Sequence, residues 1–386
     1  MSEGTNQRRR VAVVTGSRAE FGLLRPVMHA VREHPGLELA VIAAGSHLVS
    51  PAETYRDVKR EFGDHIADAI PMQVAGRSGR LEDAEALGTG VSRFTRSFAR
   101  LRPDWIVVLG DRIEAFAAAA AASVGGFALA HIHGGDRAEG VADEAMRHAI
   151  TKLAHLHLVA TEQSAARIRR MGERAEHVVV VGSPAIDGLD AIKPLRDAKW
   201  EELGRPEFVV LMHPVGRTAD EEDRTASAVL GAIGGKRVVV LHPNFDAGRE
   251  GTLGAIERAA AHAPDLVRVV RHLARDEFVA LLRRLGESGG VLVGNSSAAL
   301  IEAGALRVPA VDIGPRQESR ERATNVVRAA DESTAAIRAA IDAARSIDRA
   351  SIAHPFGDGH AGRRIAALLA ATNPLDPVLL RKRWAD

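Results

Sequence analysis

The sequence predicts an α/β protein built from two Rossmann-like domains, and three observations support this. Short apolar runs alternate with amphipathic stretches along the 386 residues. A segment without any strand pattern interrupts this alternation near residues 187–207. The chain is too long to fold around one ordinary hydrophobic core, and its length suits two domains of roughly 150–200 residues each. Strands that alternate with helices imply parallel sheets with right-handed crossovers.

The apolar runs identify the strands that we expect in each half. In the first half they lie at 11–15, 39–44, 105–109, 127–131, 156–161 and 178–181. In the second half they lie at 208–212, 238–242, 267–270, 291–294 and 310–313. We therefore expect an N-terminal domain at residues 1–190 and a C-terminal domain at 205–360. Two such domains facing each other form a central cleft that suits a nucleotide and a second group.

Composition excludes several classes of protein. Apolar residues make up 46% and charged residues 26% of the chain, as in ordinary soluble proteins. A net charge of +1 predicts no general attraction to nucleic acid or membranes. The chain has no cysteine, which excludes disulfides and thiolate metal sites and fits a cytoplasmic location. The apolar stretch at 113–132 carries Glu114 and a glycine pair, so we expect a buried helix and strand there, not a membrane span.

Ionisable residues gather directly after the predicted strand at 127–131. They are His131, His133, Asp136, Asp143, Glu144, Arg147, His148 and Lys152. In an open α/β sheet, ligands bind at the carboxyl ends of strands. Carboxylates, imidazoles and an arginine at that edge equip it for proton transfer beside an anionic ligand. The simpler alternative is a surface ion pair between Asp143 and Arg147, which are four residues apart on a helical pattern. His131, His133 and Asp136 fit no common zinc spacing, so we expect no metal.

Two further turns in the first half are candidates for the same site. Gly16 permits a tight turn after the first strand, and Arg18 could pair with a phosphate at the helix N-terminus that follows. Glu20 either belongs to this ligand site or simply complements the helix dipole. The pattern Gly-x-Gly-x-x-Gly is absent, so no dinucleotide fingerprint is present. Asp111 ends the strand at 105–109 and is either an acid/base group or the N-cap of the next helix.

In the second half, polar residues end all five predicted strands. They are His213, then His242 and Asn244, then Arg271 and His272, then Asn295, Ser296 and Ser297, and finally Arg316. Chance explains five polar loops at one sheet edge poorly, so we expect a binding site there. The two serines, at a predicted helix N-terminus, offer hydroxyls and amides to a phosphate. The guanidinium of Arg316 suits the same group.

Several motifs in order resemble the sialic-acid-pathway branch of the UDP-N-acetylglucosamine 2-epimerases. They are Thr-Gly-Ser-Arg-Ala-Glu at 15–20, Gly-Asp-Arg at 110–112, Arg-His-Ala-Ile-Thr-Lys at 147–152, His-Pro-Val at 213–215, Gly-Asn-Ser-Ser at 294–297 and Gly-Pro-Arg-Gln at 314–317. The resemblance runs from about residue 11 to 327. It implies the glycosyltransferase-B arrangement, with the C-terminal helix at about 360–386 returning to the first domain. It also implies a UDP-sugar substrate, no cofactor, and a homodimer or homotetramer.

The resemblance implies roles for individual residues. Ser296, Ser297, Arg316 and Arg18 would contact the diphosphate, Glu302 the ribose, and His213 the diphosphate or the sugar. Asp111 and Asp143 would be the acid/base carboxylates, with Arg147 beside them. Many members carry Glu where this chain has His133. An imidazole can still move protons near neutral pH, and hydrolysing members, including ones acting on 2,4-diacetamido-6-deoxy sugars, also carry His-Ile-His-Gly-Gly.

The leading hypothesis is a hydrolysing UDP-N-acetylglucosamine 2-epimerase. As the family implies, it would eliminate UDP to give 2-acetamidoglucal and then add water to release N-acetylmannosamine. The alternatives are a non-hydrolysing epimerase that yields UDP-N-acetylmannosamine, and a hydrolysing enzyme for a UDP-2,4-diacetamido-6-deoxy sugar. A glycosyltransferase of the same fold and a nucleotide-sugar sensor without turnover also remain open.

Overall fold

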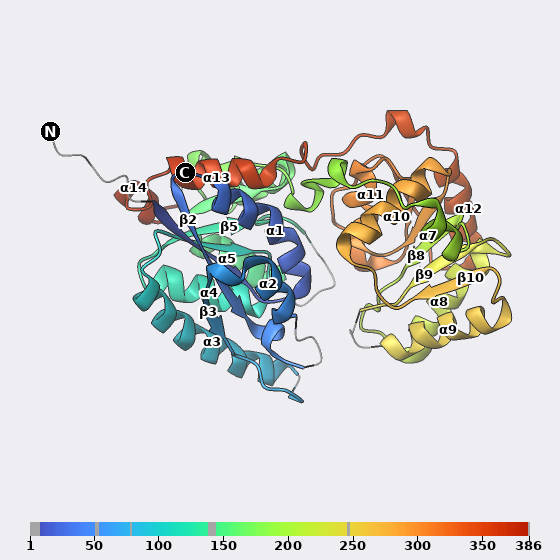
Figure 1. Cartoon of the computed structure of the whole chain (residues 1–386), viewed down its shortest axis with the longest axis horizontal. Helices are drawn as coiled ribbons and strands as arrows, with labels where there is room; N and C mark the ends of the chain where they lie inside the picture. Colours follow the sequence, from blue (N-terminus) through green and yellow to red (C-terminus); the bar gives the residue numbers. More distant parts are fainter. Residues whose placement is uncertain (1–7, 51–53, 78, 138–143, 245–247, 385–386) are drawn as a thin grey trace. The chain divides into compact units, whose positions relative to one another are not determined.

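A computed structural model describes residues 8–50, 54–77, 79–137, 144–244 and 248–384 of the chain (Figure 1). The chain divides into two compact units, each with its own parallel sheet. Unit 1 comprises residues 1–136, 142–187 and 357–386, and unit 2 comprises residues 137–141 and 188–356. The predicted class, α/β with two Rossmann-like domains, is confirmed. The chain enters unit 2 directly after Asp187, so the segment without a strand pattern near 187–207 lies almost entirely in unit 2 and carries the short helix α7 (Asp197–Glu202).

Seven parallel strands form the sheet of unit 1, in the order β3-β2-β1-β4-β5-β6-β7. Their bounds are β1 Arg9–Thr15, β2 Leu37–Ala44, β3 Ile66–Ile70, β4 Trp105–Leu109, β5 Ala128–Ile132, β6 Leu156–Val159 and β7 Val178–Val180. The sequence pattern missed β3, which lies at the sheet edge and is only partly buried along most of its length. The six expected strands are present, with ends shifted by one or two residues in most of them.

Helices cover both faces of this sheet because alternate strand residues point to opposite sides. One face packs Val11, Val13 and Trp105 against α1 (Arg18–Glu33), α2 (Tyr55–Phe62), α13 (Ala361–Ala371) and α14 (Pro377–Leu380). The other face packs against α3 (Arg80–Leu101), α4 (Ile113–Val124) and α5 (Glu144–Leu153). A further helix, α6 (Glu162–Arg170), packs on β6 and β7. The C-terminal helix α13 thus lies on the N-terminal sheet beside α1 (Figure 1).

Unit 2 repeats this plan with six parallel strands in the order β10-β9-β8-β11-β12-β13. Their bounds are β8 Phe208–Leu211, β9 Val238–Leu241, β10 Val267–Val270, β11 Val291–Gly294, β12 Ala310–Asp312 and β13 Val326–Arg328. One face packs against α8 (Ala219–Ile233), α9 (Arg249–His262) and α12 (Thr334–Arg345). The other face packs against α7, α10 (Arg275–Glu287) and α11 (Glu302–Ala305). The edge strand β13 was not predicted.

The strand orders place a topological switch point in the middle of each sheet. In unit 1 the chain runs outward in one direction from β1 and in the other from β4, and these two strands are neighbours. In unit 2 the neighbouring strands β8 and β11 have the same relation. Loops diverge above the carboxyl ends of such a strand pair, and this is where α/β folds bind ligands.

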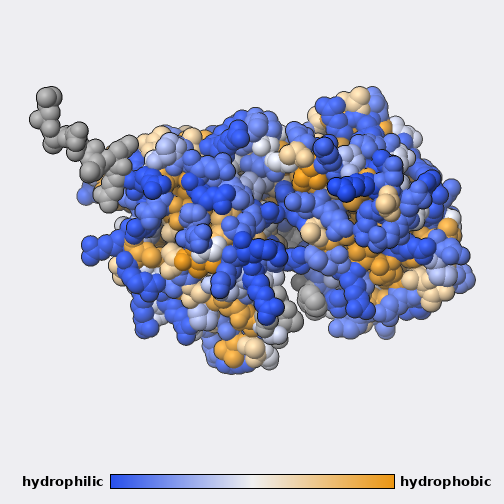
Figure 2. All heavy atoms as spheres, in the orientation of Figure 1, coloured by the Kyte–Doolittle hydropathy of each residue, from blue (hydrophilic) through white to orange (hydrophobic). Residues whose placement is uncertain are grey.

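No helix in the described ranges is both long and apolar enough to cross a membrane. In the view of Figure 2, hydrophilic residues cover most of the molecule, and hydrophobic ones form small groups among them.

The packing of α8 on α9 depends on Gly251. A Cβ atom at this position would lie 1.8 Å from the carbonyl oxygen of Ala219. We expect Gly251→Ala to lower the free energy of unfolding by about 1–3 kcal/mol, because the helices must separate. Gly254 lies one turn further along α9, and the atom nearest to its added Cβ would be the flexible end of Arg258. As the control, Gly254→Ala should raise stability by up to about 1 kcal/mol. Equal effects of the two variants in urea denaturation would contradict this packing argument.

Candidate active site

Asp111 and Arg147 form an ion pair at the switch point of unit 1. Asp111 follows β4 through Gly110, and its Oδ2 pairs with Nη2 of Arg147 on α5. The arginine is 4% exposed, and its Nη1 donates to the carbonyl of Asp136 at 2.8 Å. The N-cap of α4 is Arg112, and no side chain caps this helix. The carboxylate of Asp111 therefore pairs with Arg147 and does not cap α4.

Asp136 organises the loop that follows β5. Its Oδ2 accepts from His133 Nδ1 at 2.8 Å, and its Oδ1 accepts from Ser164 Oγ at 2.7 Å. On the other side of the imidazole, His133 Nε2 lies 3.2 Å from Ser183 Oγ. Because a carboxylate only accepts, His133 Nδ1 is the donor to Asp136. His133 has a φ of +62°, a left-handed backbone conformation that side chains other than glycine rarely adopt.

His131 serves the structure of this edge instead of its proton chemistry. The side chain is fully buried, and the ring hydrogen-bonds the carbonyl of Gly110 at 2.8 Å and Thr151 Oγ1 at 3.2 Å. Burial lowers the pKa of His131 to about 3, so the imidazole is neutral at physiological pH. The hydrogen bond from His131 Nε2 to the carbonyl of Gly110 thus holds the backbone directly before Asp111. Asp143, the other predicted carboxylate, lies outside the described residues.

The turn after β1 holds a pair of buried carboxyl groups. Ser17 is the N-cap of α1, and Glu20 accepts hydrogen bonds from the Gly16 amide at 2.9 Å and from Ser17 Oγ at 3.4 Å. Burial and the neighbouring Glu114 raise the pKa of Glu20 to about 7. Glu114 accepts from the Ser46 amide at 3.3 Å, and its side chain fills the space beside Gly16. The carboxyl group of Glu20 is thus engaged with the turn, whereas Arg18 is exposed on the first residue of α1.

His213 and Asn295 are joined at the switch point of unit 2. The side-chain amide of Asn295 accepts from the backbone N–H of His213 and donates to the backbone carbonyl of His213, each at 2.7 Å. His213 Nδ1 accepts from the backbone N–H of Asn244 at 3.2 Å. Burial, assisted by the positive charge of Arg316, lowers the pKa of His213 to about 3. The imidazole is therefore neutral, and its proton resides on Nε2 as a potential donor to a ligand.

A second group of residues holds the turn that carries Arg316. Arg316 and Gln317 both donate to the carbonyl of Asn295, at 3.3 Å and 2.8 Å. Arg322 donates to the carbonyls of Gln317 and Glu318, at 2.9 Å and 3.2 Å. The same guanidinium reaches the buried Asp312 at 3.2 Å. Ser164, Ser183, Asp312 and Arg322 were not predicted as site residues, because nothing in their spacing sets them apart. Gln317 was noted only as part of the motif at 314–317.

The remaining predicted residues of unit 2 are less closely grouped. Ser296 caps a three-residue 3-10 turn that includes Ser297, and α11 begins only at Glu302. The prediction of a longer helix opening at these serines was wrong, so a strong helix dipole does not contribute there. His242 ends β9, and Arg271 and His272 end β10, the outermost strand on that side. They share the carboxyl edge with His213, but β9 separates the β10 pair from β8.

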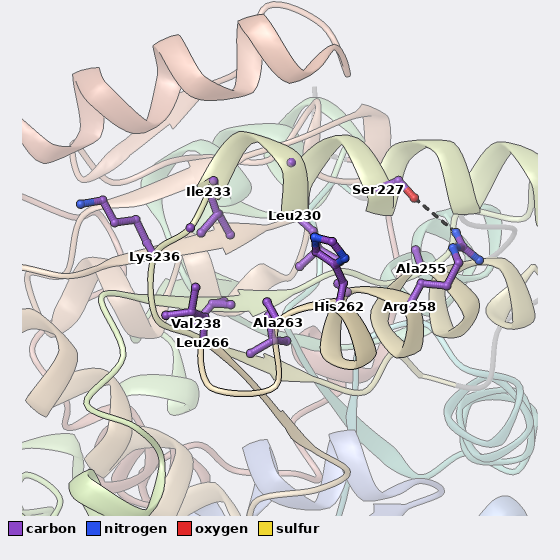
Figure 3. Close-up of a pocket in the computed structure, with 15 residues that line it drawn as sticks. Ser227, Leu230, Ile233, Lys236, Val238, Ala255, Arg258, His262, Ala263 and Leu266 are labelled. Atoms are coloured by element: carbon purple, nitrogen blue, oxygen red, sulfur yellow. Dashed lines mark hydrogen bonds between the residues drawn. The ribbon is translucent and has the colours of Figure 1, made fainter.

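A separate hollow in unit 2 does not contain these residues. It has a volume of about 510 Å³ and lies between the C-terminal ends of α8 and α9, at the amino edge of the sheet (Figure 3). Its lining is largely apolar, with Lys236, Arg258 and His262 among the polar members. Arg258 is engaged by Asp223 at 2.5 Å. Within the described ranges, no three side chains of His, Cys, Asp or Glu are grouped to hold a metal.

Comparisons with known proteins place this chain among sugar-nucleotide enzymes. The profile of the UDP-N-acetylglucosamine 2-epimerase family matches residues 29–370. A hydrolysing UDP-N,N'-diacetylbacillosamine 2-epimerase from Legionella pneumophila is 34% identical, covering 97% of this chain and 98% of the relative. A UDP-N-acetylglucosamine 2-epimerase from Neisseria meningitidis is 30% identical over 91% of each chain.

Solved structures support the fold. The crystal structure of UDP-GlcNAc 2-epimerase from Neisseria meningitidis bound to UDP-GlcNAc superposes with a TM-score of 0.77 at 18% identity. This match covers 94% of this chain and 100% of the other. The family profile and the two sequence relatives show that the chain belongs to the UDP-N-acetylglucosamine 2-epimerase family.

Proposed function

We propose that this enzyme cleaves a UDP-linked 2-acetamido sugar and releases the free sugar inverted at C2. A base removes the C2 proton, and the C2–H electron pair forms the C1=C2 double bond. The C1–O bond breaks at the same time, and UDP departs. Water then adds its hydroxyl to C1, and a proton returns to C2 on the opposite face. The ion pair between Asp111 and Arg147 at the switch point of unit 1 carries this proposal, because it presents a fixed carboxylate where a ligand is expected.

We propose that the polar edge of unit 2 binds the UDP portion of the same substrate. Arg316 supplies a positive charge for the diphosphate, and the neutral His213 supplies an N–H donor. Arg18 of unit 1 adds a second cation, and Ser296, Ser297 and Glu302 contribute hydroxyls and a carboxylate for the phosphates and the ribose. His242, Asn244, Arg271, His272 and Asn295 complete the polar edge.

We propose that Asp143 is the second acid/base carboxylate, on the strength of its motif. His133 can join the proton transfer if its bond to Ser183 opens when substrate binds, since catalytic hydrogen bonds often rearrange in the complex. In the described arrangement it instead orients Asp136. Glu20 has a comparable positioning role, because its carboxyl group is engaged with the turn that carries Arg18. The enzyme would need neither a metal nor a cofactor, and it would act in the cytoplasm as a homo-oligomer.

Two sugars are candidates for this reaction. UDP-N-acetylglucosamine, which would yield N-acetylmannosamine, is the substrate in the name of the family and of the Neisseria relative. UDP-N,N'-diacetylbacillosamine is favoured by the name of the Legionella relative, which is hydrolysing. His133 fits either sugar, because hydrolysing members that carry it include enzymes for diacetamido sugars.

Product analysis in deuterated water tests the function. Incubation with each UDP-sugar should give UDP and a free sugar that carries deuterium at C2, as detected by NMR. The sugar with the higher kcat/KM identifies the substrate. Free sugar without deuterium at C2 would refute the elimination. A UDP-linked product with no free sugar would indicate a non-hydrolysing enzyme, and a need for an acceptor before UDP is released would indicate a glycosyltransferase.

Asp111→Asn tests the assignment of the base. We expect kcat to fall by about two to four orders of magnitude with the fold intact, because the amide cannot accept the C2 proton. Asp104 provides a matched control at the opposite end of β4, where it accepts from the Arg10 amide at 2.7 Å. Asp104→Asn keeps an acceptor oxygen there and should leave kcat within about twofold, since surface changes rarely matter more. Comparable rates for the wild type and Asp111→Asn would remove Asp111 from the mechanism.

Arg322→Met tests how the diphosphate turn is held. The substitution removes the hydrogen bonds to the carbonyls of Gln317 and Glu318. We expect the Kd for UDP, measured by calorimetry, to rise about tenfold, which corresponds to roughly 1.4 kcal/mol. The control is Arg328→Met, which removes an exposed ion pair with Glu318 and should change the Kd by less than about twofold. Equal affinities of the two variants for UDP would show that the turn needs no such support.

A further inference from the structure

Residues 381–384, the last that the structure describes, lie on unit 1, beyond the stretch that the family profile matches. That match ends at residue 370, whereas the structure describes the chain to residue 384. After α14, Lys382 Nζ donates to the carbonyl of Ala154 at 2.5 Å and to Glu173 Oε2. Ala154 directly follows the last residue of α5. A lysine at this position provides the positive charge that the C-terminal end of a helix favours.

Glu173 is the centre of this contact and is almost fully buried. Its side chain is 5% exposed and accepts from Lys152 at 2.6 Å and from His157 at 3.1 Å, in addition to Lys382. Burial by itself would raise the pKa of Glu173, but these hydrogen bonds lower it to about 2. The carboxylate is therefore ionised at neutral pH. Removing one donor leaves a buried charge less well compensated.

Trp384 adds a second contact two residues further on. Lys152 Nζ lies 4.9 Å from the centre of its indole ring. A Cβ atom at Gly172 would lie 2.5 Å from the same ring, and Gly172 has a φ of +79°. The absence of a side chain at Gly172 therefore leaves space for the indole ring of Trp384. The lysine of α5 is thus held both by Glu173 and by the indole.

The helix that the tail contacts is the one that carries Arg147. Along α5, Arg147 binds Asp111, Thr151 lies 3.2 Å from His131 Nδ1, and Lys152 binds Glu173. The imidazole of His131 in turn reaches the carbonyl of Gly110. His131 and His157 are paired in register on β5 and β6. A continuous set of contacts in unit 1 therefore runs from Lys382 to the residue before Asp111.

We propose that the C-terminal tail is a positioning element, in which Lys382 and Trp384 hold α5 so that Arg147 keeps Asp111 in its reactive orientation. This inference rests on the proposed function of Asp111. Lys382 touches no reacting atom, and its effect is transmitted through the carboxyl end of α5. A shift of about 1 Å at a reacting group can lower a rate by about two orders of magnitude, so a loosened helix should lower turnover more than binding.

Lys382→Met is the principal test, with Arg383→Met as its matched control. Arg383 is the neighbouring residue and is exposed. We expect Lys382→Met to lower kcat by about tenfold or more while KM changes by less than about twofold, because the second unit binds most of the nucleotide. The control should match the wild type. Rates are compared per folded molecule, well below the unfolding temperature. A kcat equal to that of the control would overturn the proposal.

Two further measurements separate positioning from simple stabilisation. Lys382→Arg keeps the charge and the donors and should restore at least about a third of the activity, whereas failure to do so would count against the proposal. Hydrogen exchange of residues 144–154, which needs no substrate, should be faster in Lys382→Met than in Arg383→Met. Unchanged exchange would refute the contact itself, while faster exchange in an enzyme that releases no UDP would refute only the proposed function. If Lys382→Met does not fold, Trp384→Ala is subjected to the same comparison.

Discussion

The parallel direction of the strands is the constraint on which the rest of this structure depends. In a parallel sheet every carboxyl end lies at the same edge, so each sheet collects its loops on one side. The order 3-2-1-4-5-6 then separates the loops above one central strand pair, β1 with β4 in unit 1 and β8 with β11 in unit 2. Asp111 follows β4 and Asn295 follows β11. The topology of each sheet thus decides where these reactive and polar residues lie.

Backbone-directed hydrogen bonds then fix these loops in both units. In unit 1, Arg147 and His131 donate to carbonyls of Asp136 and Gly110. In unit 2, the side chain of Asn295 binds both the backbone N–H and the backbone carbonyl of His213, and Arg322 binds two carbonyls of the turn after Arg316. A side chain that hydrogen-bonds to the backbone of a loop constrains the loop's conformation, because every residue in the loop offers the same backbone groups. Buried polar groups used in this way are costly when unpaired, which restricts the loop to one conformation.

The sequence was sufficient for the parts of the fold and site that carry a repeating or charged pattern. Central strands such as β4 and β11 are continuous apolar runs because both of their faces are buried. The edge strands β3 and β13 are partly exposed and lack such runs, so the same criterion missed them. Asp111 and Arg147 were predicted because charge near a strand end is conspicuous. Ser183 was not predicted, because its partner His133 lies 50 residues away and only the folded chain brings them together. Arg322 was not predicted either, because no motif marks it, although its partners lie within ten residues in the sequence. The proximity of Glu20 to Glu114 could not be predicted from the sequence, since the two residues are 94 positions apart and only the folded chain brings their carboxyl groups together.

In the reaction that we propose, the protonation of His213 limits how it can stabilise a departing diphosphate. An imidazole with a pKa of about 3 carries no charge at neutral pH, so its Nε2–H can donate a hydrogen bond but adds no positive charge. Arg316, which itself helps to keep His213 neutral, is the cation that we propose for the diphosphate. A neutral donor beside a permanent cation stabilises the charge that develops on the leaving group and does not itself have to change protonation state. In the proposed reaction, proton transfer is thereby left to the carboxylates Asp111 and Asp143.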